Sequence, residues 1–161
     1  MNHSALNFTG SPYTSFMHET KVTLSNGIEL HVEMGGDPEH PAIMLIMGLG
    51  AQMLFWPDFF CKSLIDQGYR VIRFDNRDIG LSSKIRHSGP RLNTLKLMGR
   101  FALGLQNQGA PYNLYDMAED AALLIEHLGL EQVSVIGASM GGMIAQILAA
   151  KHPEKVSNLG L

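Results

Sequence analysis

Cysteine is almost missing from this sequence, which has a single one, Cys61, among 161 residues. One thiol excludes an internal disulfide and any metal site built from several cysteines. Cys61 lies beside Phe60 in a segment with the pattern of a helix, where a buried structural thiol is the expected role. We therefore do not expect cysteine chemistry to carry the function.

The sequence also has only a small excess of negative charge and few long apolar runs. The formal net charge is -3, so the chain has no basic surplus that would favour nucleic acid. No apolar run reaches the roughly 18 residues of a membrane-spanning helix, and the first residues lack the features of a signal peptide. With 45% hydrophobic residues, the composition indicates one soluble globular domain, which we expect in the cytoplasm.

The expected domain covers residues 19–161 and follows a loose amino-terminal arm, residues 1–18. Residues 21–24 and 28–33 alternate between apolar and polar on either side of Asn26-Gly27. An Asn-Gly pair between two such runs is a strong signal for a β-hairpin. Two antiparallel strands are therefore expected to open the fold.

Apolar runs and helical patterns then alternate along the chain. The expected buried strands are 42–47, 70–74, 133–136 and one starting at 156, and the expected helices are 57–67, 116–128 and one that begins near Met140. This alternation predicts an α/β fold with a doubly wound, mostly parallel sheet.

Residues 83–113 form the least regular part of the domain. They contain apolar residues at helical spacing, namely Leu92, Leu95, Met98, Ala102 and Leu105. We expect a lid-like segment that packs over the carboxyl edge of the sheet. A helix that lies on a membrane surface is the alternative.

The pentapeptide Gly137-Ala138-Ser139-Met140-Gly141 lies where a strand turns sharply into a helix. In that context a G-x-S-x-G pattern is typical of a serine nucleophile whose strained backbone lifts its hydroxyl above the sheet. The Met140 amide and the positive end of the following helix would face a developing oxyanion. The alternative is a tight glycine turn with an incidental serine.

Three motifs, in this order, resemble the amino-terminal half of an α/β-hydrolase. They are Met47-Gly48-Leu49-Gly50, the segment from Asp75 to Ser82, and Gly137-Ala138-Ser139-Met140-Gly141-Gly142. The resemblance is specifically to an esterase-like group related to aclacinomycin methylesterases and other serine carboxylesterases.

This resemblance implies roles for particular residues. Ser139 would be the nucleophile, and the backbone N–H groups of Leu49 and Met140 would form the oxyanion hole. Gly48 and Gly50 would let their loop approach the substrate. Three further residues are implied to hold a loop near the site, namely Asp75, Arg77 and Ser82. The sequence departs from the family pattern at Met47, where many members have His, and at Asp78, where many have Gly.

The acid and the histidine of the triad follow the serine in this fold, but 161 minus 139 leaves 22 residues after Ser139. His152 would lie at the far end of a helix, roughly 18 Å away, and His87 or His127 would need an unusual geometry. We expect a chain truncated after about the sixth strand and, without an activating base, a poor or inactive esterase by itself.

Two functions remain open on the sequence alone. The first is a serine hydrolase that acts on small-molecule carboxylic esters through an acyl-serine intermediate, with no metal or organic cofactor, no nucleic acid and no stable membrane insertion. The second is a non-catalytic binding or assembly module that retains the hydrolase scaffold. The strand that begins at Val156 would leave an open sheet edge, which predicts a homodimer or a segment-swapped oligomer.

Overall fold

The structure, a computed structural model, describes residues 16–85 and 111–161. Most of the arm, residues 1–15, and most of the lid-like segment, residues 86–110, lie outside the described residues. The elements are β1 Met17–Thr23, β2 Glu29–Gly35, β3 Ala42–Ile46, the 3-10 helix η1 Met53–Phe55, α1 Asp58–Asp66, β4 Arg70–Phe74, α3 Leu114–His127, β5 Val133–Gly137, α4 Met140–Lys151, the 3-10 helix η2 Pro153–Lys155 and β6 Val156–Gly160.

The described strands form one six-stranded sheet in the order β1-β2-β4-β3-β5-β6. The expected hairpin joins β1 to β2, which pair antiparallel, and Gly27 in the connecting turn has φ +83°. β2 also runs antiparallel to β4, whereas β4, β3, β5 and β6 pair in parallel. The predicted doubly wound, mostly parallel α/β sheet is confirmed.

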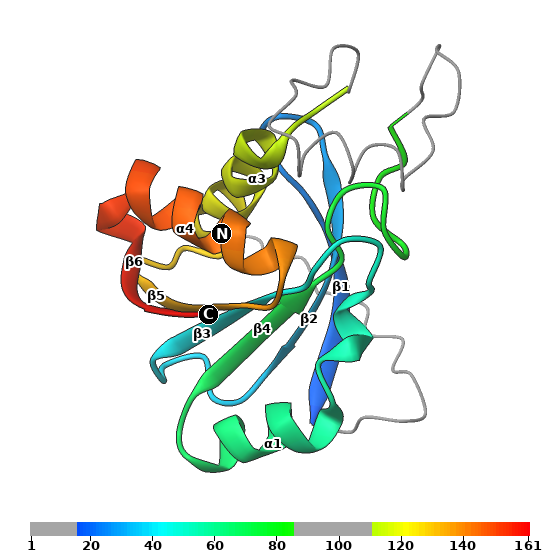
Figure 1. Cartoon of the computed structure of the whole chain (residues 1–161). Coiled ribbons are helices and arrows are strands. Elements are labelled where there is room, and N and C mark those ends of the chain that lie inside the picture. Colours follow the sequence, from blue (N-terminus) through cyan, green and yellow to red (C-terminus); the bar gives the residue numbers. More distant parts are fainter. Residues whose placement is uncertain (1–15, 86–110) are drawn as a thin grey trace, which may run out of the picture.

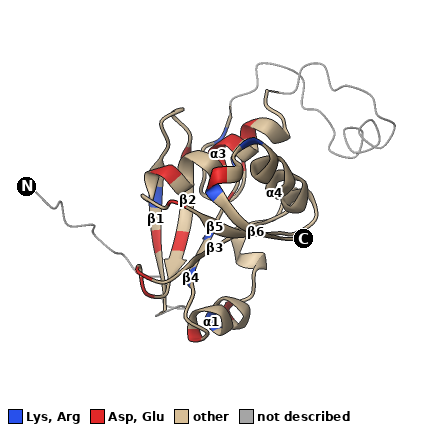
Figure 2. Cartoon of the chain, turned by 90° about the vertical axis from the view of Figure 1, so that its left-hand side faces the viewer, with Lys and Arg blue, Asp and Glu red and all other residues tan. Residues whose placement is uncertain are grey.

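Helices cover both faces of this sheet (Figures 1 and 2). α3 and α4 lie on one face and α1 on the other. β3 supplies side chains to both layers, because Met44 and Ile46 belong to the core under α3 and α4, while Ile43 and Leu45 pack with α1. Burial on both faces explains why this strand is an uninterrupted apolar run.

Two boundaries differ from the sequence-based expectation. α3 begins at Leu114 because Asn113 caps it: its side chain accepts hydrogen bonds from the Tyr115 and Asp116 amides at 2.7 and 3.3 Å. The Asp116 carboxylate in turn accepts from the Asn113 amide at 2.7 Å, which completes a capping box. In the first hairpin, β1 begins at the buried Met17, four residues before the strand that the sequence predicts from residue 21.

The start of α4 lies directly against the end of β3. A Cβ atom added to Gly141 would overlap the carbonyl oxygen of Ile46 and come within 2.9 Å of the Met47 oxygen. Both obstacles are backbone atoms, which cannot rotate away as a side chain would. A Cβ added to the neighbouring Gly142 would meet nothing closer than 3.3 Å.

The two adjacent glycines therefore give a matched pair of substitutions. Gly141→Ala is expected to lower the free energy of unfolding by about 1–3 kcal/mol or more, because α4 must shift away from β3. Gly142→Ala is expected to cost much less, since alanine favours a helix by about 1 kcal/mol over glycine. Urea unfolding of both variants measures the difference, and equal losses would contradict this packing.

Candidate functional site

Ser139 stands at the corner between β5 and α4. Its backbone has φ 55° and ψ -121°, so a non-glycine residue occupies the positive-φ region. Such a conformation costs about 1–3 kcal/mol and persists only where the surroundings impose it. The side chain is exposed. The predicted strained turn with an exposed serine is therefore what the chain forms.

The glycines on either side of Ser139 are required by space. A Cβ atom on Gly137 would overlap the carbonyl oxygen of Gly141 and come within 2.6 Å of its carbonyl carbon. Gly141 itself lies against the backbone of Ile46 at the end of β3. Backbone atoms therefore leave no room for a side chain at either glycine. Any side chain at either position would open the corner that holds Ser139.

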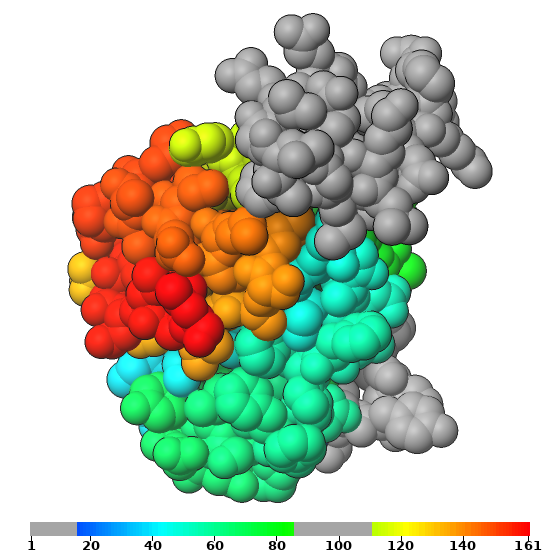
Figure 3. Space-filling model, in the orientation of Figure 1, coloured from blue at the N-terminus to red at the C-terminus, as the bar shows by residue number. Residues whose placement is uncertain are grey.

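The loop that follows β3 lies against this corner. A Cβ atom on Gly48 would be 3.1 Å from the Ala138 oxygen, 3.2 Å from the Ser139 Cβ and 3.6 Å from the Met140 nitrogen. In the space-filling view, the orange atoms at the start of α4 border the cyan atoms of the segment after β3 (Figure 3). The two motifs that the sequence assigned to one oxyanion hole are thus neighbours.

Two backbone amides at this junction have no partner within the described residues. Neither the Leu49 N–H nor the Met140 N–H donates a hydrogen bond to another described residue. Leu49 is 49% exposed, and Met140 is the first residue of α4, where the helix dipole is positive. Gly50 has φ +71° and nothing within 4 Å of an added Cβ, so its backbone conformation favours glycine, and its approach to a substrate stays a prediction.

Residues after β4 hold this loop at both ends. The Asn76 side-chain amide donates to the Met47 carbonyl at 3.0 Å. The neighbouring Asp75 accepts from the Met53 amide at 2.8 Å through Oδ1. Residues 47–53, which include Leu49, are therefore anchored by two consecutive side chains.

The segment from Asp75 to Ser82 is itself fixed by buried contacts. The Arg77 guanidinium makes two hydrogen bonds of 2.6 Å to the carboxylate of Asp120, which is 2% exposed. The Ser82 hydroxyl donates to the Asp75 carbonyl at 2.6 Å. These contacts agree with the structural loop role that the sequence suggested for these side chains.

Asp78, the departure from the family pattern, has a conformational explanation. Its φ of 68° lies in the left-handed region that favours glycine. Aspartate is among the residues that tolerate this region best, and its Oδ1 atom accepts a hydrogen bond of 2.6 Å from the Ile85 amide. The carboxylate thus gives the turn a contact that glycine would lack.

His127 and His152 both lie at the carboxyl ends of helices. His152 caps the far end of α4, with its Nε2 3.1 Å from a Glu119 carboxylate oxygen. His127 ends α3 and is exposed, and His87 lies outside the described residues. The ring hydrogen bonds of His152, and of His31 in β2, are to carboxylates and not to Ser139.

Sequence reasoning missed one buried histidine. His31 lies in β2 between two carboxylates, with Nε2 2.7 Å from Glu19 and Nδ1 3.3 Å from Asp75. The alternation of β2 predicted a strand, but it gave no sign that a side chain from the first hairpin reaches the loop after β4.

The described residues provide no cysteine, metal or membrane-spanning feature that would indicate a different site. Cys61 is fully buried, and burial raises the pKa of its thiol although the Arg73 charge opposes this. In the described part of the chain, no group of three or more His, Cys, Asp and Glu side chains could hold a metal ion. None of the helices described is both long and apolar enough to cross a membrane.

Comparison with known proteins gives consistent results. A family model described as alpha/beta hydrolase fold matches residues 41–161. Rhodomycin D methylesterase DnrP of Streptomyces peucetius is 31% identical over 140 residues, which are 87% of this chain and 40% of that protein. AB hydrolase superfamily protein YfhM of Bacillus subtilis (strain 168) is 31% identical over 135 residues, 84% of this chain and 40% of that protein.

A solved structure supports the same assignment. A hydrolase from Pseudomonas aeruginosa PA01 matches with a TM-score of 0.67 and 25% identity, over 88% of this chain and 44% of that one. This chain spans about two fifths of the length of the curated relatives named above. The family match and the relatives confirm the resemblance to an esterase-like group, and the chain belongs to the alpha/beta hydrolase fold family.

Proposed function

We propose that this chain carries the nucleophile and the oxyanion hole of a serine hydrolase that acts on carboxylic esters. Ser139 is the nucleophile, and the backbone N–H groups of Leu49 and Met140 receive the oxyanion. The observation that supports this most is the backbone of Ser139, which is strained at a strand-to-helix corner while its side chain is exposed. A turn with no chemical role would have little reason to keep a non-glycine residue there.

The proposed reaction is acyl transfer through an acyl-serine intermediate. The Ser139 oxygen attacks the ester carbonyl carbon while a base takes the hydroxyl proton. The carbonyl oxygen becomes an oxyanion that accepts hydrogen bonds from the two amides. The alcohol then leaves with a proton, and water hydrolyses the acyl-serine. Gly48 contributes by letting the Leu49 loop lie within van der Waals distance of the Ser139 turn.

We propose that this chain does not itself supply the base and the acid of the reaction. His152 is at the wrong end of α4, and His31 is occupied by Glu19 and Asp75. Removal of the triad leaves only roughly 10³–10⁴-fold catalysis over water in serine proteases. We accordingly propose that the 161-residue chain by itself is a weak or inactive esterase.

The names of the relatives support an ester as the substrate class. One of them is called a methylesterase, and a small-molecule ester is the substrate that we propose here. The alternative is a non-catalytic binding or assembly module, favoured by the carboxylate partners of His31 and His152, which hold these two histidines in contacts other than with Ser139. A cytoplasmic location stays a prediction.

Chemical rescue separates the two functions. If the scaffold is that of a hydrolase without its base, free imidazole should take the Ser139 proton while a fluorophosphonate gains a Ser139–phosphorus bond and loses fluoride. A positioned base contributes about 10²–10⁴-fold, so we expect added imidazole to speed adduct formation by about tenfold. Intact-mass spectrometry measures the adduct over time.

Two serine variants control this experiment. Ser139→Ala should form no adduct, whereas Ser134→Ala should behave like the unaltered chain, since Ser134 is hydrogen-bonded to Ser157 on β6. An adduct rate that imidazole does not change, and that is equally low in the Ser139→Ala variant, would favour the binding module. Fast labelling without imidazole would show that a base reaches Ser139, and the proposed inactivity would be wrong.

We also propose that the 161-residue chain associates through β6. Within the described sheet β6 pairs only with β5, and the three residues Ser157, Asn158 and Leu159 are exposed. An exposed strand edge with an apolar side chain is a site for pairing with another chain. A second copy of this chain is the proposed occupant, either as a dimer or by exchange of a segment.

Sedimentation velocity tests this association. We expect a concentration-dependent dimer that is lost in Leu159→Lys, because a charged side chain on an edge strand opposes pairing. Leu54→Lys introduces the same charge at an exposed leucine of η1 and should leave the dimer intact. A monodisperse monomer at high concentration in the unaltered chain would contradict the proposal.

A further inference from the structure

Asp75 is at the centre of a buried polar network beside residues 47–53, which carry the Leu49 amide and are called the oxyanion loop below. Its Oδ1 atom accepts from the Met53 amide at 2.8 Å, and Oδ2 accepts from the Leu81 amide at 3.2 Å. A Cβ on Gly80 would overlap this carboxylate. The residue is 2% exposed, so its charge is held by protein groups rather than by water.

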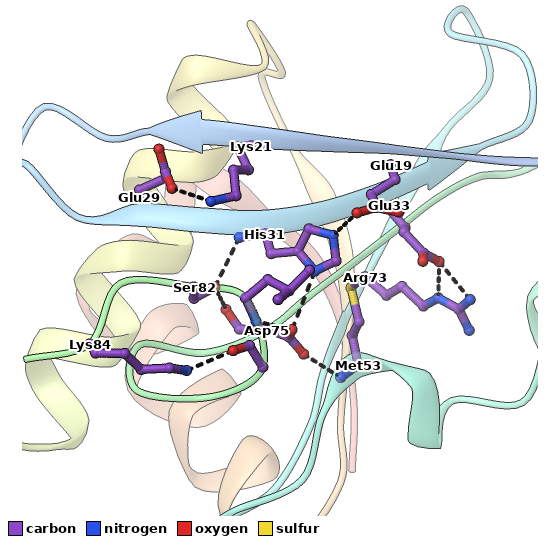
Figure 4. Close-up of polar contacts among 12 residues, drawn as sticks. Glu19, Lys21, Glu29, His31, Glu33, Met53, Arg73, Asp75, Ser82 and Lys84 are labelled. Carbon is purple, nitrogen blue, oxygen red and sulfur yellow. Dashed lines mark hydrogen bonds and ion pairs between the residues drawn. The ribbon is translucent and has the colours of Figure 1, made fainter. Parts of the chain in front are cut away.

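His31 brings a titratable group to that network (Figure 4). Its Nδ1 lies 3.3 Å from the Oδ2 atom of Asp75, and its Nε2 lies 2.7 Å from Glu19. A protonated imidazole can donate to both carboxylates at once, whereas a neutral one has a single N–H. Loss of the proton therefore leaves one of the two carboxylates without its donor.

The network is joined to the oxyanion loop by a short length of chain. Met53 is 1% exposed and begins η1, four residues after Leu49. The other end of the loop is fixed where Asn76 binds the Met47 carbonyl. The position of the Leu49 amide thus depends on two anchors, of which the one at Met53 faces an ion pair that can change its charge.

We propose that His31 is a positioning residue for the proposed reaction: in its protonated form it holds the Asp75 carboxylate on the Met53 amide and so keeps the loop bearing Leu49 in place. This inference rests on the proposed role of the Leu49 amide in the oxyanion hole. His31 itself touches neither Ser139 nor the proposed substrate position, so its effect passes through Asp75.

The direction of the pH dependence follows from the surroundings of His31. Burial lowers its pKa, but the hydrogen bonds and charges of Asp75 and Glu19 more than offset this, so the pKa lies above the ordinary 6.5. The stabilisation is then complete below about pH 6.5 and is lost as the pH rises through the pKa of the folded protein.

Asp75 titrates in the opposite sense. Burial raises its pKa, but the hydrogen bonds from His31 and from the Met53 and Leu81 amides lower it overall. The carboxylate therefore stays ionised through the range in which His31 loses its proton, and it is protonated only at acid pH. The remaining charged side chains drawn around this site are Lys21, Glu29, Glu33, Arg73 and Lys84.

Hydrogen exchange tests the proposal without any substrate. The NMR titration of the His31 ring gives its midpoint, and amide exchange corrected for its intrinsic pH dependence gives the protection of Met53, whose N–H donates to Asp75. We expect protection at Met53 to fall about tenfold or more across that midpoint, as for the loss of a charge-assisted hydrogen bond. The Leu49 amide has no partner among the described residues, so its chemical shift rather than its protection reports the loop, and we expect that shift to change across the same midpoint.

A non-titrating variant and a matched control sharpen the result. His31→Gln should show low protection at Met53 throughout, with no transition at the former midpoint. His152→Gln removes another partly buried histidine with a carboxylate partner, Glu119, and should leave the transition unchanged. A transition that persists in His31→Gln, or Met53 protection that ignores the His31 midpoint in the unaltered chain, would overturn the proposal.

Glu19→Gln gives an independent test should His31→Gln fail to fold. This change removes one carboxylate from His31 but leaves the contact with Asp75 intact. The His31 midpoint should fall by on the order of one pH unit, and the Met53 transition should move with it. A shifted midpoint with an unmoved Met53 transition would show that the histidine is merely structural.

The outcome does not depend on the serine chemistry. Failure of Ser139 to react with the fluorophosphonate would leave the exchange result standing as a property of the loop. Conversely, a reactive Ser139 with a loop that ignores His31 would leave the hydrolase proposal intact and remove only the role of His31.

Discussion

The structure depends on the close approach of the first turn of α4 to the end of β3. The carbonyl oxygen of Ile46 in β3 lies where a side chain at position 141 of α4 would be. The carbonyl oxygen of Gly141 lies where a side chain at position 137 would be. These contacts fix Ser139 in a conformation that its own backbone disfavours. The same approach brings the Gly48 loop to the Met140 amide, so that one packing constraint produces both halves of the proposed site.

Buried polar groups from the loop after β4 support this arrangement from a second direction. Asn76 and Asp75 hold the two ends of residues 47–53, and Arg77 ties the loop to α3 through Asp120. A buried charge without partners is strongly destabilising. These contacts are therefore expected to stay formed in the folded protein, and they hold the oxyanion loop in one position.

Much of this could be predicted from the sequence, because the relevant signals are local. The apolar run of β3 indicates a strand covered on both faces, and the run from Arg70 to Phe74 matches β4 residue for residue. The elbow follows from one pentapeptide in its strand-to-helix context. The apolar spacing predicts the start of α3 two residues too late, because the helix start is set by the capping box between Asn113 and Asp116 and not by apolar residues.

Contacts between distant residues could not be predicted in the same way. His31 and Asp75 are 44 positions apart, and Arg77 and Asp120 are 43 apart. The local sequence pattern around one residue of such a pair does not indicate which distant polar side chain it will contact. The left-handed backbone at Asp78 was likewise hidden, since only a departure from the family pattern pointed to it.

A crystal structure of the chain with a small boronic acid bound would test the central claim most directly. The account predicts a tetrahedral boronate on the Ser139 oxygen, with one boronate oxygen about 2.7–3.1 Å from the amide nitrogens of both Leu49 and Met140. A boronic acid bound elsewhere, or a boronate whose oxygens face away from these two amides, would contradict it.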